Sequence, residues 1–261
     1  MTQKIIVERL GQSAIVTINN PPANVWTIES LQELARAMDA LAADTAIRAV
    51  VLTGAGERYF SAGADLALFG DGAAAQAGKV ADAFALAFDA VRHYPGVTVA
   101  AVNGFALGGG LECALACDYI VAERGASLGL PEARVGLIPC AGGTKALTDR
   151  VGVPWAKRLI LGGEFVTADK AMAIGLVEEV VESGLAKIVA LSLAARVREQ
   201  SPQAIHAARR LIEASPAQTL AAQLAAEKAA FLALIGSAEQ LEGVRAFNEK
   251  REPGWAEQDD D

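Results

Sequence analysis

The sequence predicts an α/β fold that ends in a purely helical region. Up to about residue 185, short apolar segments rich in β-branched residues alternate with segments of helical periodicity, which is the pattern of an α/β core. Beyond that point the helical period continues and almost no strand signal remains. We therefore expect a core over residues 1–200 and a C-terminal helical region over residues 201–261, in which Ser201-Pro202 starts a helix.

The first two elements are predicted to be a hairpin and a capped helix. Residues 4–10 and 13–19 alternate between apolar and polar side chains and are joined by Gly11-Gln12, so they form two paired strands. Thr27 is a suitable N-cap for a helix that runs to about Ala43. Its apolar residues recur at helical spacing and define the buried face: Ile28, Leu31, Leu34, Met38 and Leu41.

The middle of the chain contains several short apolar segments that predict buried strands. They are residues 49–52, 60–66, 98–102, 119–122 and 127–130. The small, Gly-rich segment 70–79 is predicted to be a loop, and Val80 to Val91 a helix. Four helices are expected in the C-terminal part, over residues 184–200, 202–214, 217–235 and 237–249.

The composition excludes several classes of protein. A formal net charge of −8 argues against nucleic acid as a partner, because phosphate backbones require clustered Lys and Arg. No apolar run is long enough to span a bilayer, and the N-terminus lacks a signal-peptide pattern. Three cysteines do not form a disulfide framework, so a cytoplasmic protein is expected. With only His93 and His206, neither a metal site nor a histidine triad is expected.

Two carboxylates near glycine-rich turns are the first candidates for catalysis. Gly108 to Gly110 precede an apolar helix that carries Glu112, and Glu132 follows Pro131 further along the chain. A carboxylate in an apolar helix is costly unless it is paired, hydrogen-bonded or used in chemistry. Two such groups can divide acid and base roles when their surroundings separate their pKa values. The alternative is structural: Glu112 forms a cap or salt bridge, and Glu132 is an ordinary residue of a first helical turn.

Two small-residue turns are candidates for an oxyanion hole. Ala62 to Asp65 and Leu107 to Gly110 each offer backbone N–H groups with little side chain in the way. Two such donors aimed at one point would stabilise a developing negative charge on a carbonyl oxygen. Close packing of the two loops explains the small residues equally well, and spacing alone favours that simpler explanation.

The glycine motifs do not match nucleotide-binding signatures. A dinucleotide fingerprint would require a third glycine where Cys113 or Tyr59 stands. The single Gly-Lys pair, Gly78-Lys79, is followed by Val80 instead of Ser or Thr. NAD and ATP are therefore disfavoured as cofactors.

At this point the sequence resembles the crotonase superfamily of enoyl-CoA hydratases and isomerases, most closely the bacterial hydratases. The resemblance covers nearly the whole chain and is specific for the fold. It is less specific for the reaction, since the family performs several reactions on acyl-CoA thioesters. The matching segments are FSAGADL (60–66), AVNGFALGGGLECALACD (101–118), LGLPEARVGLIPCAGGT (128–144) and A-x-x-x-GLV (171–177).

The resemblance implies a fold, a site and an assembly. The fold is a spiral of ββα units with a helical C-terminal region that forms homotrimers and homohexamers. The thioester oxygen is bound by the backbone N–H groups of Ala62 and Gly109, while Glu112 and Glu132 handle the water and the α-carbon proton. No bound cofactor is implied, because the substrate itself carries coenzyme A. The implied CoA-binding positions are Ala62, Ala64, Asp65, Leu66 and Gly108.

Three segments depart from the family pattern and leave the acyl pocket undefined. Cys140 stands where relatives usually have glycine, and Pro22 to Trp26 replaces a common small-residue pattern. Residues 67–82, which usually shape the acyl pocket, are short and alanine-rich. Lys250 or Arg251 are further candidates for contact with the CoA phosphates, although a surface position is the simpler expectation.

The sequence therefore predicts hydration of 2-enoyl-CoA to 3-hydroxyacyl-CoA in the breakdown of fatty acids or related acids. A Δ3-Δ2-enoyl-CoA isomerase, or another CoA-thioester lyase of the same fold, is the alternative within the family. A non-catalytic binding protein on the same scaffold, including an RNA-binding one, is the alternative from a different class. Glu112, Glu132 and the acidic net charge count against that last alternative.

Overall fold

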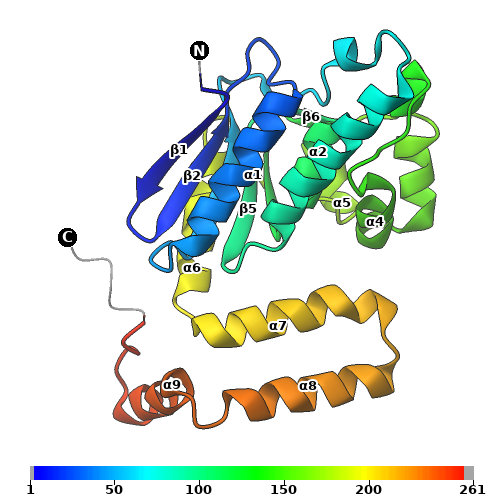
Figure 1. The fold of residues 1–261 in the computed structure, drawn as a ribbon. Helices are drawn as coiled ribbons and strands as arrows, with labels where there is room; N and C mark the ends of the chain where they lie inside the picture. The colour runs from blue at the N-terminus through cyan, green and yellow to red at the C-terminus, as the bar shows by residue number, and fades with distance from the viewer. Residues whose placement is uncertain (1–2, 256–261) are drawn as a thin grey trace. The chain divides into compact units, whose positions relative to one another are not determined.

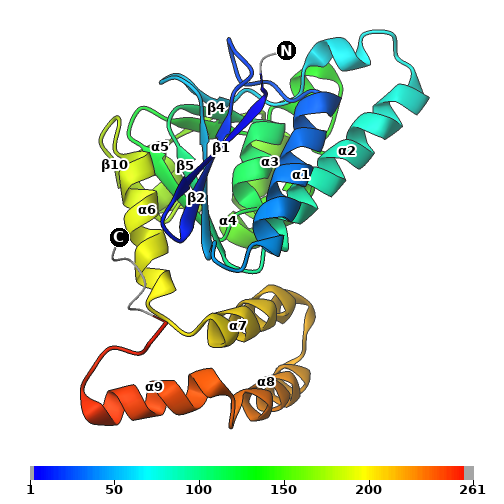
Figure 2. The ribbon, with the colours of Figure 1, turned by 60° about the vertical axis from the view of Figure 1, so that its left-hand side comes forward.

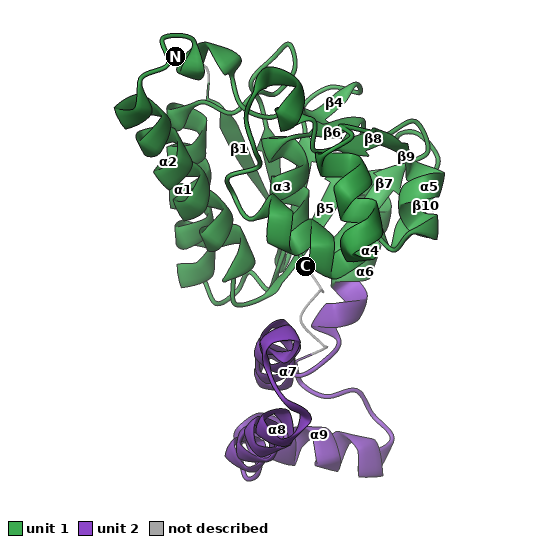
Figure 3. Ribbon diagram, turned by 90° about the vertical axis from the view of Figure 1, so that its right-hand side faces the viewer, with its two compact units in different colours: residues 1–194 green, residues 195–261 purple. Residues whose placement is uncertain are grey.

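The computed structural model describes residues 3–255, which form two compact units. Residues 1–194 make up the first unit and residues 195–261 the second, as Figure 3 shows in green and purple. The sequence predicted a boundary at residue 200. The observed boundary falls six residues earlier, inside helix α6 (Ala186–Arg198).

The first unit contains two sheets, and most of their strands alternate along the chain. One sheet has the strand order β1-β2-β3-β5-β7-β10 and the other the order β4-β6-β8-β9. The strands of the first sheet are β1 (Ile5–Leu10), β2 (Ser13–Ile18), β3 (Ala49–Gly54), β5 (Val97–Val102), β7 (Tyr119–Glu123) and β10 (Glu179–Val181). Those of the second are β4 (Tyr59–Ser61), β6 (Phe105–Leu107), β8 (Ser127–Gly129) and β9 (Val166–Thr167).

Three successive turns of the chain, β3-β4, β5-β6 and β7-β8, each add one strand to each sheet before a helix, which confirms the predicted spiral of ββα units. β1 and β2 pair antiparallel, whereas β2, β3, β5, β7 and β10 run parallel. The helices of this unit are α1 (Ile28–Ala43), α2 (Ala74–Arg92), α3 (Gly109–Leu115), α4 (Gly143–Ile160), α5 (Ala168–Ala173) and α6. Short 3₁₀ turns, η1 (Leu66–Phe69) and η2 (Glu132–Val135), follow β4 and β8.

Helices α1 and α2 lie side by side over one face of the large sheet (Figure 1). Thr27 caps α1 as predicted: its side chain accepts the N–H of Ser30, and Ser30 reciprocates at the Thr27 N–H, which forms a capping box. Leu31, Leu34 and Met38 are fully buried against the sheet. The apolar face read from the sequence is therefore the core-facing face of the helix.

The opposite face of the large sheet is covered by small side chains of α6. Ala186, Ala190 and Ala194 are completely buried and recur every four residues, so the helix lies close to the strands. Figure 2 shows α6 across the large sheet from α1. The strand residues on this face are Val51, Val99 and Val121, which are also fully buried.

The second unit contains α7 (Pro202–Ala214), the short 3₁₀ turn η3 (Ser215–Ala217), α8 (Leu220–Leu234) and α9 (Ala238–Glu249). These helices agree with the predicted ones to within a few residues. Among the described side chains of α7, α8 and α9, only Ala246 is buried. Large apolar side chains stand in solvent instead, including Leu220, Phe231 and Phe247, which are 75%, 62% and 84% exposed.

One predicted element was wrong and one strand was missed. Residues 74–79 belong to α2 and do not form a loop, because Ala, Gln and Lys are good helix formers and outweigh the glycine among them. Strand β6 was not predicted; only its last residue, Leu107, was assigned, to the glycine turn. Its three residues, Phe105 to Leu107, are too few to show a period.

Among residues 3–255, no single helix is long and apolar enough to cross a membrane. Helices α8 and α9 meet that requirement only as a pair, with a bend of 78° between them. Over the same residues, no three His, Cys, Asp or Glu side chains are grouped so that they could hold a metal ion.

Candidate active site

The site forms where the loop after β4 crosses the start of α3. Gly108 has a left-handed φ of +53° and turns the chain from β6 into α3. A Cβ atom on Gly110 would lie only 2.2 Å from the carbonyl oxygen of Ser61, so any side chain there would separate the two segments. The glycine run is therefore required for this close approach, whatever else it does.

Glu112 lies on α3, only 3% exposed, and its carboxylate is anchored by backbone groups. The N–H groups of Ala141 and Gly143 both donate to Oε1, each at 2.8 Å. Burial raises the pKa of Glu112, while these N–H groups and the positive charge of Arg92 oppose the rise. Oε1 is thus fixed in place, and the carboxylate has one well-defined orientation.

Glu132 begins the 3₁₀ turn η2, directly after Pro131. Its Oε2 atom is buried, and no described residue donates a hydrogen bond to it. Burial, followed by the negative charge of Glu112, raises the pKa of Glu132 to about 7, although its own backbone N–H opposes the rise. Close to neutral pH this carboxyl group is therefore able both to give and to accept a proton.

The backbone donors differ from the predicted pair at one position. The N–H of Ala62 donates to the carbonyl oxygen of Ala23 at 3.0 Å, so it is already used within the fold. The N–H groups of Ala64 and Gly109 line the same cavity and have no acceptor among residues 3–255. We therefore correct the donor pair from Ala62 and Gly109 to Ala64 and Gly109.

Trp26 holds the Ala64 segment in the orientation that frees its N–H. The N–H of Trp26 donates to the carbonyl of Gly63 at 2.8 Å, and the N–H of Asp65 donates to the carbonyl of Trp26 at 2.9 Å. These two bonds form a parallel bridge between Trp26 and Ala64 that leaves the Ala64 N–H outside the pairing. A Cβ atom on Gly63 would lie 3.3 Å from the nitrogen of Gly109, which places the two donor segments against each other.

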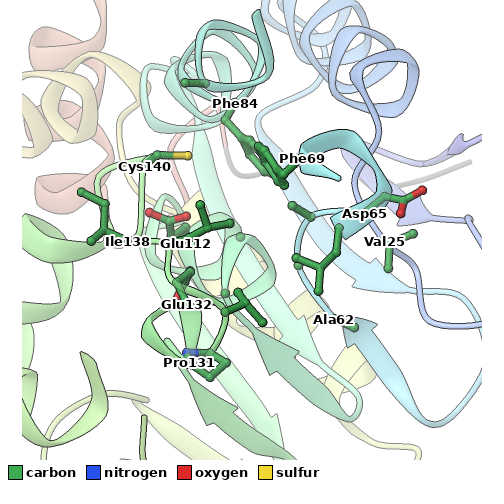
Figure 4. A pocket seen from close by; sticks show the side chains of 18 of the residues that line it. Val25, Ala62, Asp65, Phe69, Phe84, Glu112, Pro131, Glu132, Ile138 and Cys140 are labelled. Carbon is green, nitrogen blue, oxygen red and sulfur yellow. The ribbon is translucent and has the colours of Figure 1, made fainter. Parts of the chain in front are cut away.

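The carboxylates and the two donors line one cavity of about 730 Å³. Figure 4 shows Glu112, Glu132 and Cys140 on one side of it, with Val25, Ala62 and Asp65 across from them. All five positions expected to bind coenzyme A also line this cavity: Ala62, Ala64, Asp65, Leu66 and Gly108. Of these, Asp65 uses a carboxylate oxygen to cap η1, where it accepts the N–H of Ala67 at 3.0 Å.

One wall of the cavity belongs to α2. Ala77 and Ala81 present methyl groups there, Gly78 presents bare backbone, and Phe84 presents a ring that is only 2% exposed. A Cβ atom on Gly109 would lie 2.8 Å from that ring, so Phe84 packs directly against the glycine whose N–H is a donor. Figure 4 shows Phe69 and Phe84 together at this wall.

Cys140 stands beside both carboxylates and is solvent-exposed. Partial burial and the charges of Glu112 and Glu132 raise the pKa of its thiol to about 11, so it stays protonated at neutral pH. Cys113 on α3 and Cys117, two residues beyond the end of that helix, are both buried. The reactive chemistry of the site therefore belongs to the carboxylates.

The two glutamates and Gly109 were predicted from the sequence to lie at the site, but several other parts of the site were not predicted. Val25, Phe84 and the backbone of residues 141–143 were not predicted to face the cavity. The glycine pair Gly142-Gly143 was the available signal for the last of these. A Cβ atom on Gly143 would lie 2.8 Å from Oε1 of Glu112, so that residue has to be glycine.

This arrangement suits proton transfer next to an activated carbonyl group. Two N–H donors can bind a carbonyl oxygen and stabilise the negative charge that develops on it. Two carboxylates in different surroundings can give and accept protons on neighbouring atoms. Most of the lining residues are apolar, and a low local dielectric strengthens both effects.

Comparison with known proteins identifies relatives along the whole chain. The family model described as enoyl-CoA hydratase/isomerase matches residues 11–258. The 2,3-dehydroadipyl-CoA hydratase of Escherichia coli K12 is 38% identical over 253 residues, which cover 97% of this chain and 98% of that protein.

Solved structures give the same result. The Pseudomonas aeruginosa protein DspI superimposes with a TM-score of 0.94 at 51% sequence identity, covering 97% of each chain. An enoyl-CoA hydratase from Bacillus anthracis superimposes with a TM-score of 0.92 at 36% identity, covering 96% of this chain and 98% of the other.

Proposed function

The chain belongs to the enoyl-CoA hydratase/isomerase family, and we propose that it adds water to 2-enoyl-CoA thioesters to give 3-hydroxyacyl-CoA. The observation that carries this proposal is the pair Glu112 and Glu132, which line one cavity with the free N–H groups of Ala64 and Gly109. Hydration requires one group to activate water and another to protonate carbon. This pair supplies both.

The thioester oxygen accepts the N–H groups of Ala64 and Gly109. Addition of water at Cβ moves an electron pair from the double bond through Cα to this oxygen, and the two donors stabilise the resulting enolate. Removal of one such donor typically costs about 10²–10³ in rate. Because both donors are backbone groups on rigid turns, no reorganisation is needed as the charge develops.

Glu112 takes the proton of the attacking water, and Glu132 delivers a proton to Cα. Glu112 has Oε1 fixed by two backbone N–H groups, which leaves Oε2 to orient the water. Glu132, with a pKa of about 7, is protonated in a large fraction of molecules at neutral pH. The net change is one water added and no proton taken from the solvent, so the carboxyl pair carries one proton before and after each turnover.

Coenzyme A lies along residues 62–66, with Gly108 beside it, in this proposal. Leu66 is 54% exposed at this edge of the cavity, which supports an entry for a long polar molecule there. Arg251 is not available for the phosphates within its own chain, because it is paired with Glu242 at 2.6 Å and with Glu249 at 2.7 Å.

The cellular setting and the assembly are further parts of the proposal. We infer a cytoplasmic enzyme of fatty-acid or related acyl-CoA breakdown, which forms a homotrimer or homohexamer. The exposed apolar side chains of α8 and α9 support self-association, since monomeric proteins rarely leave so many large apolar groups in water.

Parallel assays on 2-enoyl-CoA and 3-enoyl-CoA test the reaction. The proposal expects formation of 3-hydroxyacyl-CoA from the 2-enoyl substrate at a kcat/KM well above that for conversion of the 3-enoyl substrate. Faster isomerisation of the 3-enoyl substrate would instead establish the enzyme as a Δ3-Δ2-enoyl-CoA isomerase.

A further inference from the structure

Trp26 is fully buried and does not line the cavity, yet it contacts both segments that carry the backbone donors. We propose that Trp26 is a positioning residue: its backbone holds the Ala64 donor and its indole ring holds the Gly109 donor, so one residue sets the spacing of the two N–H groups. This inference deepens the proposed function and rests on it, because the thioester oxygen is assigned there to the same two donors.

The backbone of Trp26 fixes only the first donor. Its N–H and carbonyl groups pair with Gly63 and Asp65, the residues on either side of Ala64. Any residue other than proline can form these two bonds, because no side-chain atom takes part in them. The type of side chain at position 26 therefore matters through what the ring contacts.

The indole ring reaches the second donor segment. A Cβ atom on Gly109 would lie 3.4 Å from Cδ1 of Trp26, which is a van der Waals contact. The same Cβ position lies 2.8 Å from the ring of Phe84, so two aromatic side chains meet the first residue of α3 together. Gly109 has no side chain of its own to anchor it, and the rings packed around its Cα atom limit how far its N–H can move.

Trp26 belongs to an aromatic cluster next to Gly109, and the other members of that cluster hold its ring in place. The ring of Phe88 meets Trp26 edge-to-face with centroids 5.6 Å apart, and it meets Phe84 in the same way at 5.4 Å. All three side chains are at most 2% exposed. Interlocked buried rings have little freedom to tilt, so the indole is a firm support for the glycine beside it.

The indole N–H separates this role from ordinary core packing. Nε1 of Trp26 is buried and has no hydrogen-bond acceptor among residues 3–255. A buried donor without a partner lowers stability, and a purely apolar side chain avoids that loss. Packing alone therefore does not favour tryptophan here. The size of the ring, which spans from the Ala64 segment to Gly109, is the compensating advantage.

The spacing of the donors matters for the rate. An oxyanion accepts both N–H groups well only if each lies about 2.7–3.1 Å from it. A shift of about 1 Å in a positioned group can lower the rate about 10²-fold. The loss appears mainly in kcat, because the bonds to the oxygen strengthen as negative charge develops on it.

Isotope-edited infrared spectroscopy of bound butyryl-CoA tests the inference without turnover, because this saturated thioester has no double bond to hydrate. Its carbonyl carbon is labelled with ¹³C, and the stretching frequency of that carbonyl falls when hydrogen bonds polarise it. We expect the band to move to lower frequency on binding to the wild type. Trp26→Leu should lose about half of that shift or more, since one of the two donors is displaced from the oxygen.

Hydration kinetics on 2-enoyl-CoA give the second readout. Trp26→Leu should lower kcat about 10²-fold with little change in KM. Trp26→Phe keeps an aromatic ring and should restore part of both kcat and the infrared shift. Leu34→Ala is the control for a loosened core, since Leu34 is fully buried on α1 and does not line the cavity. It should keep the wild-type shift and kcat, although the cavity that it leaves lowers stability.

Three results would overturn the inference: the full infrared shift in Trp26→Leu, an equal loss of the shift in Leu34→Ala, or no shift on binding to the wild type. If Trp26→Leu does not fold, Trp26→Phe is compared with the wild type instead, and an undiminished shift in that variant has the same meaning. A wild type that shifts the carbonyl band but does not hydrate 2-enoyl-CoA would contradict the proposed hydration alone.

Discussion

At the scale of single residues, the site depends on two carboxyl groups whose surroundings differ. Glu112 is anchored by backbone N–H groups, whereas Oε2 of Glu132 is buried without a partner. The second group therefore resists ionisation, and burial is the main cause. Hydration and the reverse dehydration both require that Glu112 and Glu132 together carry one proton at neutral pH.

The pH dependence of the reaction follows from that single proton. Glu132 has a pKa of about 7, above its usual value of 4.5, so it loses its proton as the pH rises through 7. We expect kcat/KM for hydration to fall about tenfold per pH unit above that point, and kcat/KM for dehydration to fall in parallel. Initial rates between pH 5 and pH 9 measure both; a flat profile across that range would contradict the assigned roles.

Gly143 tests the anchoring of Glu112. A Cβ atom at this position would lie 2.8 Å from Oε1, so Gly143→Ala should displace the carboxylate and lower kcat by about 10²-fold, as loss of a positioned general base does. KM should change little. Gly136→Ala is a useful comparison for general strain, because Gly136 has a positive φ but no atom near its Cβ position; equal losses of kcat in the two variants would mean that strain alone is responsible.

Some of these residues could be predicted from the sequence and others could not. Glu112, Glu132 and Gly109 stand in motifs whose chemistry is evident locally. The choice between Ala62 and Ala64 as donor depends on which N–H the distant Ala23 carbonyl accepts, and no local pattern encodes that bond. Val25 was not predicted for a different reason: its segment departs from the family pattern.

At the scale of elements, α2 is the helix that lines the cavity in which the substrate is proposed to bind. Its start was predicted six residues too late, and with it Ala77 and Gly78 were assigned to a loop. In the structure these residues and Ala81 form a smooth wall of the cavity, which Phe84 closes against Gly109. In the proposed complex with substrate, this helix would limit how far the acyl chain extends.

Phe84→Ala tests this role of α2. Removal of the ring should open space beyond the oxyanion donors and raise kcat/KM for long-chain relative to short-chain 2-enoyl-CoA by about tenfold, the factor expected when a few buried methylene groups find new contacts. Phe88→Ala is the matched control, because Phe88 is equally buried, contacts Phe84 edge-to-face at 5.4 Å and does not line the cavity. The same shift in both variants would assign the effect to general loosening of the core.

At the scale of the whole molecule, the division into a spiral core and a helical region was readable because the hydrophobic period changes along the chain. The presence of a second sheet could not be predicted, because its strands β4, β6, β8 and β9 have only two or three residues each. Their pairing is decided by contacts between distant segments. The family resemblance supplied that part of the prediction.

The helical region makes a prediction about assembly. Leu224 and Phe231 lie seven residues apart on one face of α8 and are 54% and 62% exposed. Sedimentation should give three or six times the chain mass of 27.0 kDa, and Leu224→Asp with Phe231→Asp should reduce it. Ala226→Asp with Ala233→Asp, two exposed positions on the other side of the same helix, serves as the control for added negative charge. A stable monomer of the wild-type chain would contradict the proposed assembly.

Hydration kinetics of Glu112→Gln and Glu132→Gln test the two-carboxylate mechanism most directly. Glutamine keeps the shape of each side chain and, at position 112, an oxygen that can still accept the two backbone N–H groups. We predict that each variant loses about 10²–10⁴ in kcat while it binds an unreactive saturated acyl-CoA almost as tightly as the wild type, and that the surface variant Glu8→Gln is unaffected. Wild-type turnover in both glutamine variants would contradict the mechanism.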